Sequence, residues 1–111
     1  MLQDLVIFQK TYDLILWLYP AVNKFPKSQR FVLGQQVENM AIQVLKDIIV
    51  ANQEINKTVS LKKISVDLDE FRILIRLSKD LRFFSIKQYE MASLKINEIG
   101  RLLNGWTRKF A

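Results

Sequence analysis

The sequence predicts an all-α fold, an antiparallel up-down-up-down four-helix bundle formed by residues 1–111 as a single domain. Apolar residues recur at alternating spacings of three and four through four successive segments, which is the period of helices packed in a bundle. The chain contains only 3 Gly and 2 Pro, too few turn residues for a β-sandwich or barrel. Half of its 111 residues are hydrophobic, which excludes a disordered chain.

Two apolar stripes run side by side along the first predicted helix. One has heptad spacing and consists of Leu5, Phe8, Tyr12, Ile15, Tyr19 and Val22. The other is widened by Leu16 and Trp17 and consists of Ile7, Leu14, Leu18, Ala21 and Phe25. An outer helix of a monomeric bundle needs one stripe about 100° wide. Either this helix is unusually buried within the domain, or one face meets another subunit. We favour a homo-oligomer, with the contact formed by Ile7, Leu14, Trp17, Leu18 and Phe25.

Residues 24–27 predict a tight corner after this helix. Pro26 disfavours helical geometry at Phe25, and Ser28 is expected to cap the next helix. That second helix has an apolar seam of Leu33, Val37, Met40, Val44, Ile48 and Ala51. Gly34, early in this helix, indicates either close approach of a neighbouring backbone or a tolerated residue in the first turns. The polar run at 52–57 predicts the second turn.

The third and fourth helices repeat the same periodicity. The third has a seam of Leu61, Ile64, Leu68, Phe71 and Ile75, and the fourth has one of Tyr89, Ala92, Ile96, Ile99, Leu103, Trp106 and Phe110. Between them, Ser85 and Gln88 have the spacing of a capping box, the clearest helix start in the chain. Gly100 and Gly105 predict close helix–helix contact, or a late kink near Gly105.

The composition argues against an enzyme. The chain has no His and no Cys, which removes disulfides, thiol chemistry, the commonest metal ligand and the commonest general base near neutrality. No glycine-rich phosphate-binding loop is present. The carboxylates fall mainly on predicted outer faces without inward pairing: Asp4, Asp13, Glu38, Asp47, Asp67, Glu70, Glu90 and Glu98. We therefore expect no catalytic residue, cofactor, metal or small-molecule substrate.

The sequence also predicts a cytoplasmic protein with no membrane partner. No uncharged run of about 18 residues could form a transmembrane helix. The first residues, Met1–Asp4, have no basic region of the kind that begins a signal peptide.

The chain is basic, with 17 Lys and Arg against 11 Asp and Glu and a net charge of +6. Cations gather on one face of the third helix, continue into the next corner, and share a face of the fourth helix: Lys62, Arg72, Arg76 and Lys79, then Arg82, then Arg101 and Arg108. Asp69 can pair with Arg72 or Arg76. Spaced cations on long helices suit phosphate contacts, which give affinity for nucleic acid without sequence specificity. The alternative is an ordinary solvated basic surface.

Two blocks of sequence resemble a known family. Residues 25–36, FPKSQRFVLGQQ, look like the start of the second helix of Avd-type proteins, the accessory variability determinants of diversity-generating retroelements. Residues 85–90 and 97–106 resemble that family's fourth helix. The family lies within a wider group of four-helix-bundle proteins encoded in 23S rRNA intervening sequences. Its Gly-Gly-Trp sequence appears here as Asn104-Gly105-Trp106, a mild departure.

The resemblance implies a non-enzymatic partner protein. Avd-type proteins assemble as homopentameric, barrel-like rings with a basic surface, bind the retroelement reverse transcriptase, and associate with RNA or DNA during mutagenic retrohoming. By position, Arg72, Arg76, Lys79 and Arg101 are the candidates for that surface. The alternative is a structural or protein–protein interaction bundle of the rRNA intervening-sequence type, with no polymerase partner.

Overall fold

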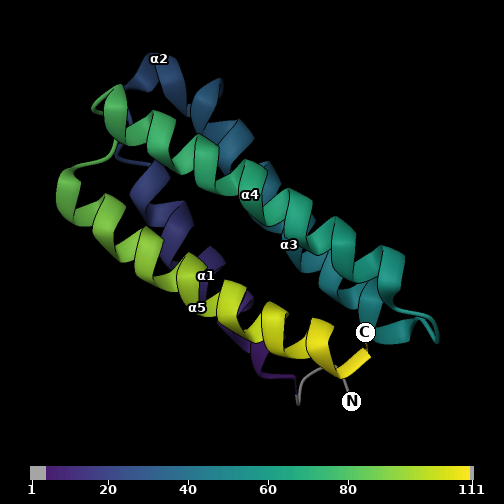
Figure 1. Ribbon diagram of the computed structural model, residues 1–111. Coiled ribbons are helices and arrows are strands. Elements are labelled where there is room, and N and C mark those ends of the chain that lie inside the picture. Colours follow the sequence, from purple (N-terminus) through teal and green to yellow (C-terminus); the bar gives the residue numbers. More distant parts are fainter. Residues whose placement is uncertain (1–4, 111) are drawn as a thin grey trace.

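The computed structural model describes residues 5–110, which form five helices (Figure 1). Four are long and one is a single turn: α1 Val6–Val22, α2 Lys27–Arg30, α3 Leu33–Gln53, α4 Thr58–Asp80 and α5 Ile86–Phe110. The expectations for the start of the chain, including an outer position for Asp4, lie outside the described residues.

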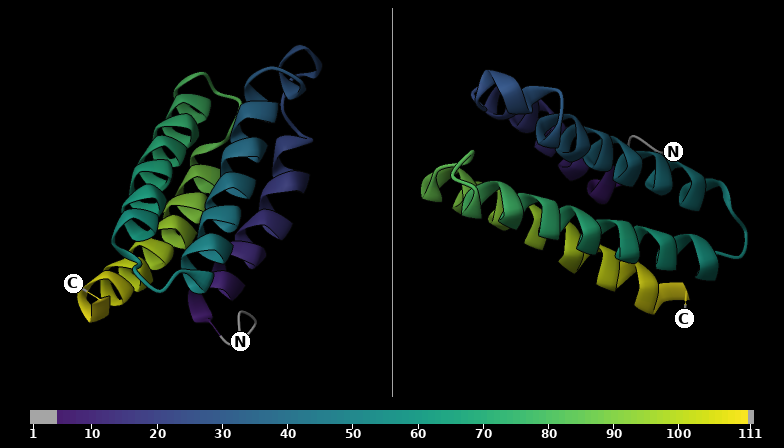
Figure 2. Two further views of the ribbon diagram at one scale, coloured as in Figure 1. Left: turned by 90° about the vertical axis from the view of Figure 1, so that its right-hand side faces the viewer. Right: turned by 90° about the horizontal axis from the view of Figure 1, so that it is seen from above.

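The four long helices pack side by side in a body of 43 × 22 × 22 Å (Figure 1). Helix α1 lies against α3 and α5, and α4 lies against the same two helices, so α1 and α4 are diagonal to each other. Successive long helices run in opposite directions, and the first turn of α1 and the last turn of α5 share one end of the molecule (Figure 2). The all-α prediction is confirmed, and this packing fits the predicted bundle.

The predicted seams of α3, α4 and α5 form most of the core. All five seam residues of α4 are buried, as are Val37, Val44, Ile48 and Ala51 of α3 and Ala92, Ile96, Ile99 and Leu103 of α5. In each of these helices one apolar stripe has an uninterrupted heptad repeat, and that stripe packs inward.

The prediction of which α1 residues face inward and which form a subunit contact was wrong. Four of the five side chains expected at a subunit contact are buried within the monomer, because they form the face that packs on α3 and α5: Ile7, Leu14, Leu18 and Phe25. Trp17, the fifth, is only partly buried. Conversely, Tyr12 and Tyr19, assigned to the inward seam, are 46% and 39% exposed. The second stripe therefore packs inward, while the first stripe is split: Tyr12 and Tyr19 are exposed, Val22 is buried, and Leu5, Phe8 and Ile15 are half-buried against the core.

The polar residue Thr11 accounts for this error. Thr11 is fully buried among the core residues of α1, and its hydroxyl donates a hydrogen bond to the Ile7 carbonyl at 2.8 Å. A threonine can satisfy its hydroxyl on the preceding turn of its own helix, so it can occupy a core position at little cost. It interrupts the stripe that forms the core face, whereas the other stripe is apolar at every heptad position.

The first corner contains more structure than expected. Ser28 is not a helix cap but part of α2, and α3 begins at Leu33 with no side-chain cap. Gly34 does mark a close approach, because a Cβ there would lie 2.8 Å from Val22 Cγ1. By contrast, no atom lies within 4 Å of a Cβ built at Gly105, so close contact does not explain that residue.

The corner between α4 and α5 packs against the end of α1. The capping box is confirmed: the Ser85 amide donates to Gln88 Oε1 at 2.9 Å, and the Gln88 amide donates to Ser85 Oγ at 3.1 Å. Just before it, Phe83 and Phe84 pack on Phe25, with ring centroids 5.6 Å and 4.8 Å away. This aromatic cluster joins the end of α1 to the α4–α5 connection.

Arg82 adopts an unusual backbone conformation at this corner, with φ of 66°. The Arg82 amide donates to the Lys79 carbonyl at 2.9 Å and the Phe83 amide to the Ser78 carbonyl at 2.8 Å. This pair of bonds is the Schellman motif, whose left-handed position glycine normally occupies. An arginine there carries a backbone cost of about 1–2 kcal/mol.

Asp47 on α3 and Asp67 on α4 correct the prediction that carboxylates stay on outer faces. Both are buried, at 5% and 7% exposure, and interact with each other and with the Lys63 ammonium. Lys63 Nζ lies 2.9 Å from Asp67 Oδ2, and Gln43 Nε2 donates to Asp47 Oδ1 at 2.9 Å. Asp47 Oδ2 has no hydrogen-bond partner among the described residues.

Burial and the nearby Asp67 carboxylate raise the pKa of Asp47 to about 6. Conversely, the hydrogen bond with Asp47 lowers the pKa of Asp67. A single proton on Asp47 therefore satisfies both groups, because the carboxylic acid can donate to the ionised partner.

This pair predicts that the protein becomes more stable as the pH falls from 7.5 to 5. Folded Asp47 binds a proton below about pH 6, whereas unfolded Asp47 binds one only near pH 4, so folding is favoured between these values. The lowered pKa of Asp67 acts below about pH 4 and does not cancel the effect. Urea unfolding at one fixed protein concentration should show a gain of about 1.4 kcal/mol between pH 7.5 and pH 5.

Asp47→Asn should remove this pH dependence and stabilise the protein at pH 7.5, because a neutral amide replaces the buried charge. Glu90→Gln, at an exposed position on α5, is the matched control and should retain the dependence. An unchanged pH slope in Asp47→Asn would contradict the assignment.

Candidate nucleic-acid interface

A groove follows the contact between α4 and α5 along the bundle. It consists of four hollows in a row, and each hollow shares lining residues with the next. Ser65 and Asn104 line both the first and the second hollow, and Arg72 and Asn97 line both the second and the third. Tyr89 lines both the third and the fourth. The groove extends from Thr58 and Phe110, near the end that holds the last turn of α5, to Ser85 at the opposite corner. We call it the α4–α5 groove.

Small and polar side chains line the groove between the two helices. Ser65 comes from α4, and α5 contributes Ser93, Asn97, Gly100, Asn104 and Thr107. Their hydroxyl and amide groups can donate and accept hydrogen bonds. The groove therefore offers polar contacts along its length.

Five of the seven predicted cations line this groove. Lys62, Arg101, Arg72, Lys79 and Arg82 occur in that order from one end to the other. Arg76 and Arg108 are exposed on the same two helices but outside the groove lining. The structure thus gathers cations that are up to 39 residues apart in the sequence, Lys62 and Arg101, along one feature.

Arg72 crosses from α4 to α5 over Gly100. A Cβ at Gly100 would lie 2.6 Å from Arg72 Nη2, so the absence of a side chain makes room for the guanidinium. On its other side, Arg72 Nη1 donates to Asp69 Oδ1 at 2.9 Å. Gly100 was predicted to allow a close contact between helices, and the group that lies close to it is the Arg72 guanidinium.

Two aspartates partly neutralise the cations of α4. Asp69 pairs with Arg72, while Asp80 lies 3.3 Å from Lys79 Nζ and 3.8 Å from Arg76 Nε. Lys79 Nζ also lies 4.5 Å from the centroid of the Tyr89 ring, a cation–π contact. These exposed ion pairs contribute little stability, so their cations can be drawn to a phosphate at small cost.

The cations of the first corner are not part of this groove. The Arg30 Nε group donates to the Phe25 carbonyl at 3.1 Å, which gives it a structural role. Lys24 lines a different groove, between α1 and α5. Lys27 is exposed on α2.

The polar groove lining was missed from the sequence. Asn97 and Asn104 are seven residues apart and so share a face of α5 with Gly100, a signal that was available. The sequence did not show that this face lies against Ser65 and Arg72 of α4. That requires the order of the helices around the bundle.

The outer face of α1 is a second exposed surface of unusual character. Tyr12, Leu16 and Tyr19 are exposed there. Partial burial, with the neighbouring Glu38 carboxylate, raises the pKa of the Tyr19 hydroxyl. Burial likewise raises the pKa of Glu38. This face is therefore more apolar than a solvated helix surface usually is.

Within residues 5–110, no three His, Cys, Asp or Glu side chains come together in a cluster able to hold a metal ion. Nor does any helix in this part of the chain combine the length and apolar character needed to cross a membrane.

Comparison with known proteins gives one clear relationship. The family model for bAvd-like proteins matches residues 5–110, which is nearly the whole chain and includes all five helices. No curated protein matches the sequence. The matched region contains both sequence blocks noted above and the complete α4–α5 groove. The chain therefore belongs to the bAvd-like family.

Proposed function

We propose that this protein is a non-catalytic accessory protein of a diversity-generating retroelement, which binds the reverse transcriptase and RNA or DNA and so supports mutagenic retrohoming. Membership of the bAvd-like family fits such an accessory role. The observation that supports nucleic-acid binding is the α4–α5 groove, where five cations line a channel that is polar in its middle and also contains apolar side chains such as Leu61, Phe110 and Ile86 at its ends.

The groove suits the backbone of a nucleic acid. Phosphates pair with guanidinium and ammonium groups whatever the sequence, and Asn and Ser side chains can bond to sugar and phosphate oxygens. No helix is placed as a recognition helix with base-reading side chains, so the proposed binding is not sequence-specific.

We further propose that the protein acts as a homo-oligomer, with five copies as the family resemblance implies. The support is the exposed apolar side of α1, formed by Tyr12, Leu16 and Tyr19. Such a surface on a small protein is typical of an interaction site. It replaces the buried residues first expected at the contact.

Arg72→Ala with Arg76→Ala should weaken binding of a fluorescent single-stranded oligonucleotide, because one cation that lines the groove and one exposed cation beside it on α4 are lost. The slope of log affinity against log salt should fall by about 1 to 2. Anisotropy titrations measure both quantities. Lys27→Ala with Lys46→Ala removes the same charge from exposed positions outside the groove and should bind nearly as the parent does.

Binding by the parent that does not change between about 50 and about 500 mM salt would contradict the electrostatic mechanism. Normal binding by the Arg72 and Arg76 double variant would show that another face is used. A parent protein that binds no nucleic acid at all would favour the alternative function, a protein–protein interaction bundle with no polymerase partner. An rRNA gene beside the gene for this protein would also indicate that alternative.

Arg82→Gly should separate stability from binding. Glycine relieves the left-handed conformation at φ of 66°, so the free energy of unfolding should rise by about 1 kcal/mol. The missing side chain should lower oligonucleotide affinity. Arg82→Ala is the matched control: affinity should fall equally without the gain in stability. If affinity is unchanged in both variants, Arg82 is not part of the binding surface.

A further inference from the structure

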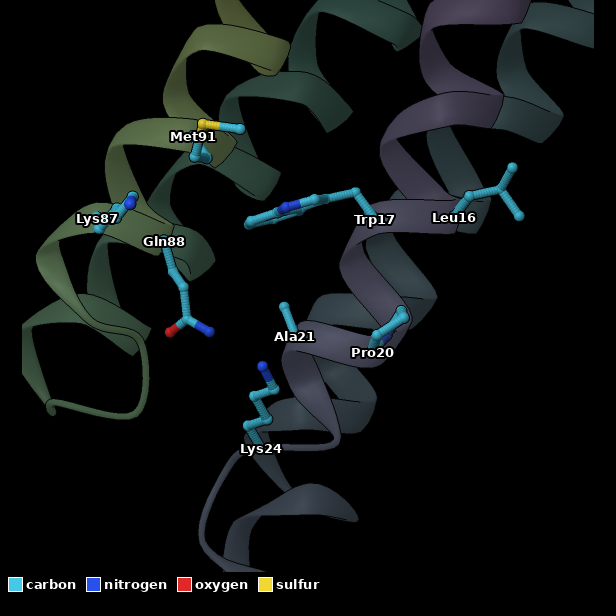
Figure 3. A pocket seen from close by; sticks show the side chains of 8 residues that line it. All are labelled: Leu16, Trp17, Pro20, Ala21, Lys24, Lys87, Gln88 and Met91. Carbon is cyan, nitrogen blue, oxygen red and sulfur yellow. The ribbon is translucent and has the colours of Figure 1, made fainter.

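A second groove lies between α1 and α5, on the other side of α5 from the proposed nucleic-acid interface. It has a volume of about 530 Å³. The Trp17 indole extends from α1 toward Met91 on α5, with Pro20 and Ala21 one turn further along α1 (Figure 3). We call it the Trp17 groove. Phe84 packs beneath it, with its ring centroid 6.4 Å from that of Trp17.

The polar groups of the Trp17 groove are mostly hydrogen-bond donors. Lys24 and Lys87 stand at its edge, and neither forms an ion pair with a described residue. Gln88 has its Oε1 engaged by the Ser85 amide, which leaves its NH₂ group available. No carboxylate lines the groove. It therefore suits an apolar ridge that carries a carboxylate.

Helix α4 of the same chain has such a ridge on its outer face. Val66, Ile73 and Leu77 are exposed there, and the exposed Glu70 lies between Val66 and Ile73. Spacings of four, three and four residues place all of them on one stripe of the helix. We call these four residues the α4 stripe. Of them, Glu70 forms no ion pair with a described residue.

The Trp17 groove and the α4 stripe face different directions. Helices α1 and α4 are diagonal in the bundle, so the stripe cannot reach the groove of its own chain (Figure 2). A second copy can supply it. The groove follows α1 from Leu16 to its end at Val22, about 9 Å of helix, and continues to Lys24, which gives it room for the two turns between Glu70 and Leu77.

We propose that the α4 stripe of one copy docks in the Trp17 groove of the next, with Glu70 beside Lys24 and Lys87. This contact joins two different surfaces, so it is heterologous: it continues from copy to copy and forms a ring where the rotation between copies closes. It leaves the α4–α5 groove open on each copy. The inference rests on the proposed oligomer and names the surfaces that build it.

Two exposed positions allow a direct test. Ile73→Arg disables the stripe and Met91→Arg disables the groove, and both residues are exposed in the single chain, so the helices should still form. Light scattering should show that each variant alone is monomeric. Mixed in equal amounts, they should form a heterodimer, because the intact groove of one accepts the intact stripe of the other. Leu94→Arg, exposed on α5 outside both surfaces, is the matched control and should assemble as the parent does.

Charge reversal gives an independent second test. Lys87→Glu and Glu70→Lys should each raise the protein concentration at half-dissociation at least tenfold. The double variant should recover most of the loss, because the reversed charges face each other again. In a Trp106→Phe background, Trp17 emission should shift to longer wavelength as the protein is diluted and the groove becomes exposed.

The outcomes separate this inference from the proposed oligomer. A parent protein that is monomeric at micromolar concentration overturns both. A parent oligomer that survives Ile73→Arg and Met91→Arg overturns only the inference and assigns the contact to another face, such as the outer face of α1. Monomeric variants that fail to pair when mixed also overturn it, since they would indicate a contact between identical surfaces.

Discussion

The aromatic cluster that joins the corner after α1 to the corner between α4 and α5 is the contact on which both grooves of this protein depend. Phe25, from the corner after α1, packs on Phe83 and Phe84, from the corner between α4 and α5. Phe84 in turn packs on Trp17. Phe83 and Phe84 enter the cluster because the chain reverses at Arg82, in a conformation that arginine adopts at a cost. The same cluster thus fixes one end of the α4–α5 groove and the floor of the Trp17 groove.

The four long helices form a square in cross-section, and the side chains between neighbouring helices differ in character from one pair to the next. Cations and small polar residues lie between α4 and α5, an apolar groove with lysines lies between α1 and α5, and two carboxylates share a buried site between α3 and α4. Since α1 and α4 are diagonal in the bundle, the α4–α5 groove and the Trp17 groove lie on different sides of α5. The proposed nucleic-acid contact and the proposed assembly contact can therefore be occupied together.

How far the sequence could predict this depended on the helix. In α3, α4 and α5 the predicted seams contribute most of the buried core, although Phe110 at the end of the α5 seam is exposed. In α1 both stripes are apolar, and the buried Thr11 made the true core face look interrupted. The cations of the groove could be predicted because their spacing places them on common faces. The groove lining, and the pairing of Asp47 with Asp67, join different helices and require the packing itself.

Arg72 gives the α4–α5 groove a built-in energetic connection between ligand binding and helix packing. Its guanidinium fills the space above Gly100 on α5 and holds Asp69 on its own helix. A phosphate that draws this group away removes a contact between the two helices and leaves a carboxylate unpaired. Part of the binding free energy is then offset by the loss of these contacts, and any change that tightens Arg72 on α5 lowers affinity for the ligand. By reciprocity, a strand bound in the proposed way would loosen the junction between α4 and α5 and so weaken the packing of the two helices.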